Sequence, residues 1–284
     1  MDIEVLLKEI DKESFQYKGE TYNVQKVGYN ITSSTYIISG KQNKYVFKTK
    51  VSEEEICVYR NSSSLGFDLH LPKFEYIGSD CVMYEFVDYN TKISVNNYQK
   101  VLDWVISKNL YFIGRKIPNL KIRQSSYAID LSLEAIKILS DQGRSDIVKR
   151  IENSKLTLQH LEELSKTQPL TLEHNDLHFQ NILINPNEDD FKIIDWGEVR
   201  YGDGWIDIVY ILREMRVLGM QVSEWDKLFV YCANALGGFN DSKSLFMAAN
   251  LSRCIKDINY FCNIPKYKEI FDWQIFLLDK IIDF

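Results

Sequence analysis

The stretch LTLEHNDLHFQNILI, residues 170–184, decides how this sequence is interpreted, because it sets four polar side chains between two apolar runs. These side chains are His174, Asp176, His178 and Asn181. Asn and Asp are common turn residues whose side chains form local hydrogen bonds, so an ordinary turn is one interpretation. A loop that carries catalytic side chains is the other. The rest of the chain has to distinguish the two.

The composition is that of an ordinary globular protein. The chain has 284 residues, 45% of them hydrophobic and 26% charged, which suits one large domain or two smaller lobes. Its net charge of −6 comes without a basic stripe, so we expect no nucleic acid as a partner. No apolar run approaches the roughly 20 residues that span a bilayer, and the first residues lack a signal-peptide layout. We therefore expect a cytoplasmic protein without a membrane partner; the sequence does not indicate its oligomeric state.

The five cysteines favour reduced thiols in the core. Their number is odd, and none of them forms a C-x-x-C pair. A disulfide framework or a cysteine metal site is therefore the weaker interpretation.

The first third of the chain has the pattern of an antiparallel sheet. Val, Ile, Tyr and Thr predominate in segments that Gly, Asn, Ser or Asp separate, and these segments predict strands. They are residues 21–27, 33–40, 44–50, 73–78 and 81–87. Residues 52–60 break the alternation and predict a helix, which Ser52 can cap. Three glutamates in its first turn suit the positive end of the helix dipole.

After Asp88 the pattern becomes helical. The segments 94–110, 128–139, 146–164 and 205–219 repeat apolar residues at helical spacing, and short strands are expected around 170–172 and 191–194. We therefore predict an α+β fold with a small β-rich N-terminal lobe, residues 1–87, and a larger, mostly helical C-terminal lobe, residues 88–284.

Several residues have the chemistry that phosphoryl transfer from ATP requires. That reaction needs a carboxylate to take the proton of the acceptor hydroxyl, oxygen ligands for Mg²⁺, and a lysine on the phosphates. Asp176 and Asn181 lie five residues apart on one loop, and Asp195 directly follows a short apolar strand. Lys48 lies in the third predicted strand, and the glutamate-rich helix follows it. Each requirement thus has a candidate residue.

The pattern HxDxxxxN followed by IIDW resembles the aminoglycoside phosphotransferase and choline kinase family, which has a bilobal protein-kinase-like fold. Residues 174–181 match its catalytic loop, residues 194–196 match its metal-binding segment, and residues 202–214 match the Gly-Asp stretch that opens the next helix. The resemblance implies that the first lobe binds nucleotide and that the second carries catalysis and substrate binding.

The resemblance also implies a role for each candidate. Asp176 would be the catalytic base, Asn181 and Asp195 would hold Mg²⁺, and Lys48 would bind the phosphates of ATP or GTP. Its carboxylate partner is expected among Glu53, Glu54 and Glu55. We favour Glu55, because Val58 and Tyr59 then follow at i+3 and i+4 as the buried face of the helix.

Further residues would support the nucleotide and the loop. Backbone groups of Tyr84 and Phe86 would contact adenine, and His174 and Asp207 would brace the catalytic loop internally. The segment VGYNITSST, residues 27–35, departs from a glycine-rich phosphate loop because it has a single glycine. Ser33 and Ser34 are candidate donors there.

The acceptor is expected to be a small molecule. Only 11 residues separate Asp195 from Asp207, and no A-P-E motif follows, so the segment is too short for the peptide platform of a protein kinase. Glu198 and Asp279, with further acids near the C-terminus, would suit the ammonium groups of an amino-sugar. We slightly favour such an acceptor over choline or ethanolamine.

Three alternatives remain. His174 and His178 have the spacing of a metal pair, but they lie on a loop without an obvious third ligand, which disfavours zinc. Trp196, Tyr201 and Trp205 could form an aromatic cage for a quaternary ammonium, although core packing is the commoner role. A non-catalytic relative that binds nucleotide or serves a structural role is the third, although such proteins usually lose the base or a metal ligand.

Overall fold

The computed structural model describes residues 3–27, 34–88, 94–121, 124, 126–128, 130–185, 190–236, 242–262, 264 and 268. The contacts within the chain divide it into two compact units. The first comprises Met1–Val101, Lys116–Lys121 and Asp176–Val199, and the second comprises Leu102–Arg115, Ile122–Asn175 and Arg200–Phe284. The lobe boundary that we predict at residue 87 stays a prediction.

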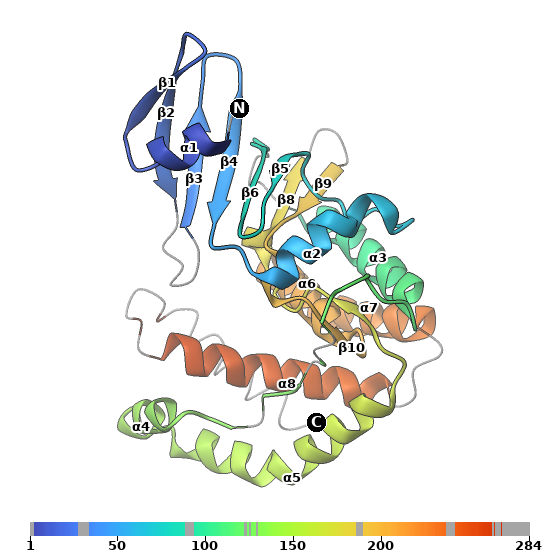
Figure 1. The fold of residues 1–284 in the computed structure, drawn as a ribbon. Coiled ribbons are helices and arrows are strands. Elements are labelled where there is room, and N and C mark those ends of the chain that lie inside the picture. The colour runs from blue at the N-terminus through green and yellow to red at the C-terminus, as the bar shows by residue number, and fades with distance from the viewer. Residues whose placement is uncertain are drawn as a thin grey trace. The chain divides into compact units, whose positions relative to one another are not determined.

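A six-stranded antiparallel sheet forms the centre of the first unit (Figure 1). Its strands are β1 (Ser14–Tyr17), β2 (Glu20–Val27), β3 (Ser34–Ser39), β4 (Lys44–Thr49), β5 (Phe74–Ile77) and β6 (Cys81–Glu85). They lie in the order β1-β2-β3-β4-β6-β5. Five of them match predicted strands. The helices packed with this sheet are α1 (Ile3–Glu9) and α2 (Glu53–Asn61).

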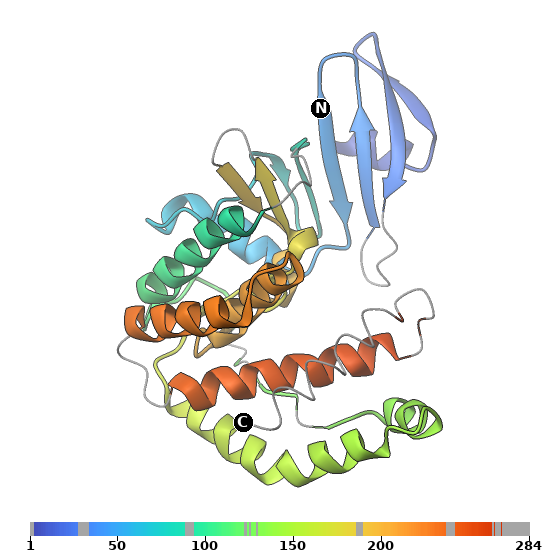
Figure 2. The ribbon, with the colours of Figure 1, turned by 180° about the vertical axis from the view of Figure 1, so that it is seen from behind.

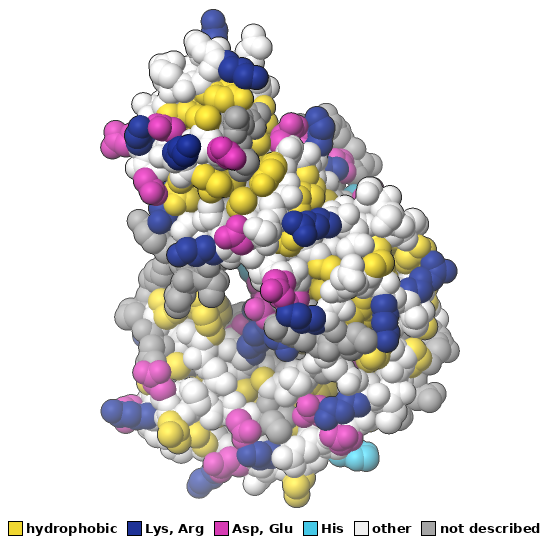
Figure 3. Space-filling view, in the orientation of Figure 1, with side chains coloured by type: hydrophobic (Ala, Val, Ile, Leu, Met, Phe, Trp, Pro, Cys, Tyr) yellow, Lys and Arg dark blue, Asp and Glu magenta, His cyan; other side chains and the backbone are white. Residues whose placement is uncertain are grey.

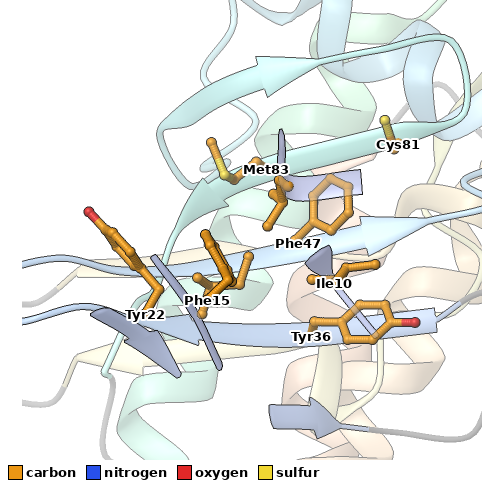
Figure 4. Packing of buried hydrophobic residues seen from close by; sticks show 9 residues of the cluster. Ile10, Phe15, Tyr22, Tyr36, Phe47, Cys81 and Met83 are labelled. Atoms are coloured by element: carbon orange, nitrogen blue, oxygen red, sulfur yellow. The ribbon is translucent and has the colours of Figure 1, made fainter. Parts of the chain in front are cut away.

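Helix α1 covers one face of the sheet (Figure 1). Leu6 within the helix is fully buried, and Ile10 just after it is 7% exposed. Both pack against apolar side chains of the strands, which Figure 4 shows from close by. These are Phe15, Tyr22, Tyr36, Ile38, Phe47, Cys81 and Met83. Because side chains alternate along a strand, the neighbours of these residues point to the other face.

Helix α2 packs near that opposite face. Phe47 belongs to the core under α1, so the next residue of β4, Lys48, faces away from it. The ring of Tyr59 in α2 lies 4.5 Å from the ring of Phe74, which in turn lies 5.8 Å from that of Tyr84. An aromatic cluster therefore joins α2 to β5 and β6.

A second hairpin completes the first unit. It consists of η2 (Phe179–Asn181), β8 (Ile182–Asn185), β9 (Asp190–Ile193) and η3 (Trp196–Glu198). Ile182 pairs with Ile193, so the start of β8 and the end of β9 lie side by side. The end of η2 and the segment that leads from β9 to η3 consequently lie at the same end of the hairpin.

The second unit is mostly helical. It contains a two-stranded ladder of β7 (Thr171–Glu173) and β10 (Arg200–Gly202), and α3 (Val95–Phe112) ends in it. The other helices are α4 (Leu133–Asp141), α5 (Ser145–Thr167), α6 (Trp205–Val217), α7 (Val222–Ala235) and α8 (Ser242–Phe261). Helix α8 runs alongside α5 in both views (Figures 1 and 2). Helix α6 is the core helix of this unit, since ten of its thirteen residues are buried.

The structure differs from the predictions in three places. Helix α1 and strand β1 were not predicted, because both are short, with seven and four residues. The helix predicted over 128–139 begins at Leu133, since the Ser132 side chain caps it by accepting a hydrogen bond from the Ala135 N–H at 3.1 Å. The two short strands near the polar loop belong to different ladders, because β7 pairs with β10 and β9 pairs with β8.

The surface and the helices add two observations. Basic and acidic side chains are interspersed among the described residues of the face in Figure 3. Among the helices that the structure describes, none has the length and apolar character needed to cross a bilayer.

Candidate active site

An ion pair buried between β4 and α2 is the first element of the site. Lys48 Nζ lies 2.8 Å from Glu55 Oε2 and 3.0 Å from Glu55 Oε1, and the two side chains are only 8% and 2% exposed. The Tyr59 hydroxyl donates to Glu55 Oε1 at 2.6 Å. Both oxygens of this carboxylate are therefore held by donors, as a buried charge requires.

The position at which α2 begins determines which glutamate forms the ion pair with Lys48. Ser52 caps the helix, and its Oγ accepts a hydrogen bond from the Glu55 N–H at 3.2 Å. Of the three candidate glutamates, Glu55 is the one that contacts Lys48, whereas Glu53 lies 2.5 Å from Lys121 on an exposed surface. Glu54 is buried, at 7% exposed.

Lys48 also contacts Asp195, 147 residues later in the chain. The distance from Lys48 Nζ to Asp195 Oδ1 is 2.7 Å, and the aspartate side chain is 35% exposed. Asp195 adopts the left-handed conformation, with φ 63° and ψ 61°, directly before η3. A non-glycine residue in this region is strained, and such residues concentrate at functional sites.

This arrangement shifts the pKa values of the ion pair. Burial favours the neutral form of Lys48, but the charges of Glu55 and Asp195 outweigh it, so the pKa of Lys48 is raised. Burial also raises the pKa of the Glu55 carboxyl, and the Lys48 charge opposes this shift. Lys48 therefore stays a cation, which is the form that binds phosphate.

The polar loop forms a second, adjoining cluster in the same unit. Asn181 Nδ2 donates to the Asp176 carbonyl oxygen at 2.8 Å and to Asp176 Oδ2 at 3.3 Å. The Ile194 N–H donates to the Asn181 carbonyl at 3.0 Å. Since Asp195 follows Ile194, the hairpin brings Asn181 and Asp195 to the same end. The predicted base and both predicted metal ligands thus lie on one compact segment, 176–199.

The residues present fit Mg²⁺. The Asn181 amide nitrogen is turned to Asp176, so its amide oxygen is the atom that would bind a metal ion, and the carboxylate of Asp195 is partly exposed. Mg²⁺ takes one or two such oxygens from a protein and completes its octahedral shell with water and phosphate. Within the described part of the chain, no group of three or more His, Cys, Asp or Glu side chains could hold a metal ion.

A buried network in the second unit holds the residues just before Asp176. Asp207 accepts the backbone N–H of His174 at 2.8 Å and that of Asn175 at 2.9 Å. Its Oδ2 is also paired with Lys108, and both side chains are fully buried. The supporting role of His174 and Asp207 stays a prediction, which these hydrogen bonds favour. Lys108 was not predicted.

The carboxylate of Glu173 in β7 lies against the Gly-Asp stretch. Glu173 is 1% exposed, and its Oε1 accepts the Gly204 N–H at 2.8 Å. Gly204 has φ 88°, which favours glycine. At Gly202, a side chain would collide with the Glu173 carboxylate. The two glycines therefore let β10 and the start of α6 approach a buried acid.

We expect Gly202→Ala to lower the free energy of unfolding by about 1–3 kcal/mol, because the added methyl group overpacks against Glu173. Thermal or urea unfolding would measure this. Gly197→Ala is the matched control, since the nearest atom to its new methyl group lies at 3.6 Å, and it should change stability by less than about 0.5 kcal/mol. Equal stability of both variants would contradict the collision.

The remaining predicted residues are less well placed. The Phe86 N–H donates to the Lys44 carbonyl at 3.0 Å. Because this N–H is already used within the sheet, Phe86 would contact adenine through its carbonyl oxygen. Tyr84 pairs with both β4 and β5, and its role at adenine stays a prediction. Glu198 is exposed in η3, whereas Ser33 and Asp279 lie outside the described residues.

The three aromatic residues considered for a cage are all buried. Trp196 and Trp205 are fully buried, and Tyr201 is 1% exposed. Trp205 packs in the second unit with Phe229 and Phe246, at ring distances of 5.9 and 5.7 Å. This favours core packing.

A family of known proteins matches part of the chain. A sequence model of the phosphotransferase enzyme family matches residues 127–227, which include the polar loop, Asp195 and Asp207. This match confirms the resemblance seen in the sequence. No curated protein matches the chain.

Several solved structures share the fold. The spectinomycin phosphotransferase APH(9)-Ia, in complex with ADP and spectinomycin, has a TM-score of 0.60 and 15% identity, and the match covers 99% of this chain and 95% of that one. Choline kinase LicA from Streptococcus pneumoniae has a TM-score of 0.59 and 12% identity over 100% and 99% of the two chains. A mutant of APH(4)-Ia with ADP and hygromycin B has a TM-score of 0.57 and 11% identity over 99% and 97%. The predicted α+β, protein-kinase-like fold is confirmed.

Proposed function

We propose that this chain, which carries the phosphotransferase family pattern over residues 127–227, transfers the γ-phosphoryl group of ATP or GTP to a hydroxyl of a small, cationic acceptor. One observation carries the proposal. Lys48 is held between Glu55 and Asp195, on the same unit as the Asp176–Asn181 cluster. This is the set of groups that phosphoryl transfer requires.

The nucleotide would be bound through its phosphates. Lys48 is buried, charged and fixed by two carboxylates, so it would meet the α/β-phosphates in a fixed position without reorganisation. Asn181 and Asp195 would hold Mg²⁺, which supplies charge neutralisation on the phosphates. ADP or AMP is bound in several proteins of the same fold, which supports a nucleotide co-substrate.

Asp176 would act on the acceptor. As the hydroxyl oxygen attacks the γ-phosphorus, the bond to the β-phosphate oxygen breaks, and Asp176 takes the hydroxyl proton. Its carbonyl and Oδ2 are fixed by Asn181, so the carboxylate is oriented before the acceptor arrives. Pre-oriented groups of this kind lower the entropic part of the barrier.

The acceptor is proposed to be an amino-sugar or another hydroxylated amine. The short segment from Asp195 to Asp207 supports a small molecule, and the exposed Glu198 just after Asp195 supports a cationic one. A choline or ethanolamine kinase is the second candidate, because choline kinase LicA matches this chain with a TM-score of 0.59, against 0.60 for the spectinomycin enzyme. A cytoplasmic location stays a prediction.

Release of ADP or GDP would test the proposal. The protein would be incubated with Mg²⁺ and each nucleotide across aminoglycosides, choline, ethanolamine and simple sugars, with Asp176→Asn as the blank. We expect release with one acceptor class, abolished in the variant. Nucleotide binding without any turnover would favour a non-catalytic relative, and absence of nucleotide binding would rule out the kinase.

A further inference from the structure

His178 lies between the predicted base and its predicted metal ligand and has no part in the chemistry proposed above. It is the N-cap of η2, and its ring lies beside both Asp176 and Asn181. The side chain is 26% exposed and that of Asp176 is 29% exposed, so packing alone does not fix either of them. Hydrogen bonds must therefore set how the two side chains are oriented.

The backbone determines which ring nitrogen of His178 carries the proton. The Gln180 N–H points at His178 Nδ1, with a nitrogen–nitrogen distance of 3.2 Å. A backbone N–H can only donate, so Nδ1 has to be the acceptor and carries no proton. The proton of the neutral ring consequently lies on Nε2.

Asp176 Oδ2 is an acceptor that lies near that proton. His178 Nε2 lies 3.4 Å from Asp176 Oδ2 and 3.4 Å from Asn181 Nδ2. The Asn181 nitrogen is itself a donor, because it is bound to the Asp176 carbonyl at 2.8 Å. Asp176 Oδ2 therefore accepts a hydrogen bond from Asn181 at 3.3 Å and lies 3.4 Å from the His178 nitrogen that carries the proton.

We propose that His178 is a positioning residue for Asp176. By occupying Oδ2 together with Asn181, it fixes the rotation of the carboxylate and assigns the proton transfer to Oδ1. The inference rests on the proposed function, since it names the residue that orients the base of that reaction. A general base has to reach its proton in a narrow range of geometry, so a carboxylate free to rotate would be slower.

Two substitutions separate this role from the capping of η2. In His178→Asn, the side-chain oxygen reaches about as far as Nδ1 and keeps the cap, but no donor of residue 178 reaches Asp176, and the hydrogen bond from Asn181 remains. In His178→Gln, an amide N–H reaches about as far as Nε2, whereas the cap is lost. His160→Asn is the matched control, because His160 is an exposed residue of α5.

We expect His178→Asn to lower kcat by roughly 10- to 100-fold, the effect of one hydrogen bond to a charged group, while the nucleotide KM and the unfolding temperature stay unchanged. His178→Gln should recover most of kcat but unfold at a lower temperature, and His160→Asn should match the wild type. Undiminished kcat in His178→Asn would overturn the proposal. So would a kcat that follows the unfolding temperature through all the variants.

Failure of the proposed function would look different. A wild-type protein without turnover on any acceptor would refute the kinase, whatever the variants do. The arrangement itself can then be tested by NMR of the histidine ring nitrogens in the nucleotide-free protein. We expect the proton on Nε2, with a resonance that shifts in Asp176→Asn; a proton on Nδ1 would overturn the inference.

Discussion

Replacing Lys48 with methionine is expected to lower kcat/KM for the nucleotide by about 10²- to 10³-fold, the usual cost of removing one fixed charge or donor from a phosphoryl-transfer site. Methionine has nearly the same length and fills the same space between β4 and α2. The loss would therefore report the charge that Lys48 holds against Glu55 and Asp195. Steady-state kinetics with the acceptor that supports turnover would measure it.

The same substitution is expected to destabilise the protein, and this has to be separated from catalysis. Glu55 is 2% exposed, so removal of Lys48 leaves a buried carboxylate without its cation, which costs about 3–5 kcal/mol. In Lys48→Met/Glu55→Gln, both charges are absent and Tyr59 can still donate to the amide oxygen. We expect this double variant to regain much of the stability but none of the activity.

Lys50→Met provides the control for Lys48→Met. Lys50 is exposed, two residues further along the chain, and its substitution should change stability by less than about 0.5 kcal/mol and leave kinetics unaltered. If Lys48→Met retained wild-type kcat/KM while folded, the predicted role of Lys48 at the phosphates would be wrong.

The sheet and the ion pair were accessible from the sequence for physical reasons. The alternation of side chains along β4 places Phe47 on one face of the sheet and Lys48 on the other. This pattern of period two is visible in the amino-acid sequence alone. Ser52 and the run of glutamates predict the start of α2, and Glu55 with Tyr59 predicts its buried face. Both inferences use neighbours within a single element.

The support of the loop was not accessible in the same way, because it depends on residues far apart in the chain. Lys108 pairs with Asp207, 99 residues later, and no local pattern indicates that distance. A partial signal was present. The apolar face through Tyr98, Val101 and Val105 continues to Lys108, and a lysine on a core-facing position calls for a buried partner.

His178 illustrates a different limit. The sequence shows that it lies near Asp176, and the question it raised was whether it binds metal with His174. Its actual contacts follow from the turn of η2, which directs Nδ1 to the Gln180 N–H and Nε2 to Asp176. The orientation and the tautomer of a histidine ring depend on hydrogen-bond geometry, which the spacing of residues along the sequence does not specify.

Breaking the Lys108–Asp207 pair is expected to destabilise the protein about as strongly as the loss of Lys48. Both side chains are fully buried, so Lys108→Met leaves Asp207 charged in the core and should lower the free energy of unfolding by about 3–5 kcal/mol. Lys227→Met, at an exposed position of α7, should change it by less than about 0.5 kcal/mol. Denaturant unfolding of the two variants would measure the difference, and equal values would contradict it.

A double-mutant cycle with Asp207→Asn tests how the pair acts on the loop. Asparagine can still accept one of the N–H groups of His174 and Asn175, but its amide group cannot replace both carboxylate oxygens. We expect the double variant to lose less stability than the sum of the single variants, because it leaves no unpaired buried charge. Lys108→Met keeps both acceptor oxygens in place and should reduce kcat less than Asp207→Asn does. The reverse order would mean that Lys108, and not the carboxylate, holds the backbone that leads to Asp176.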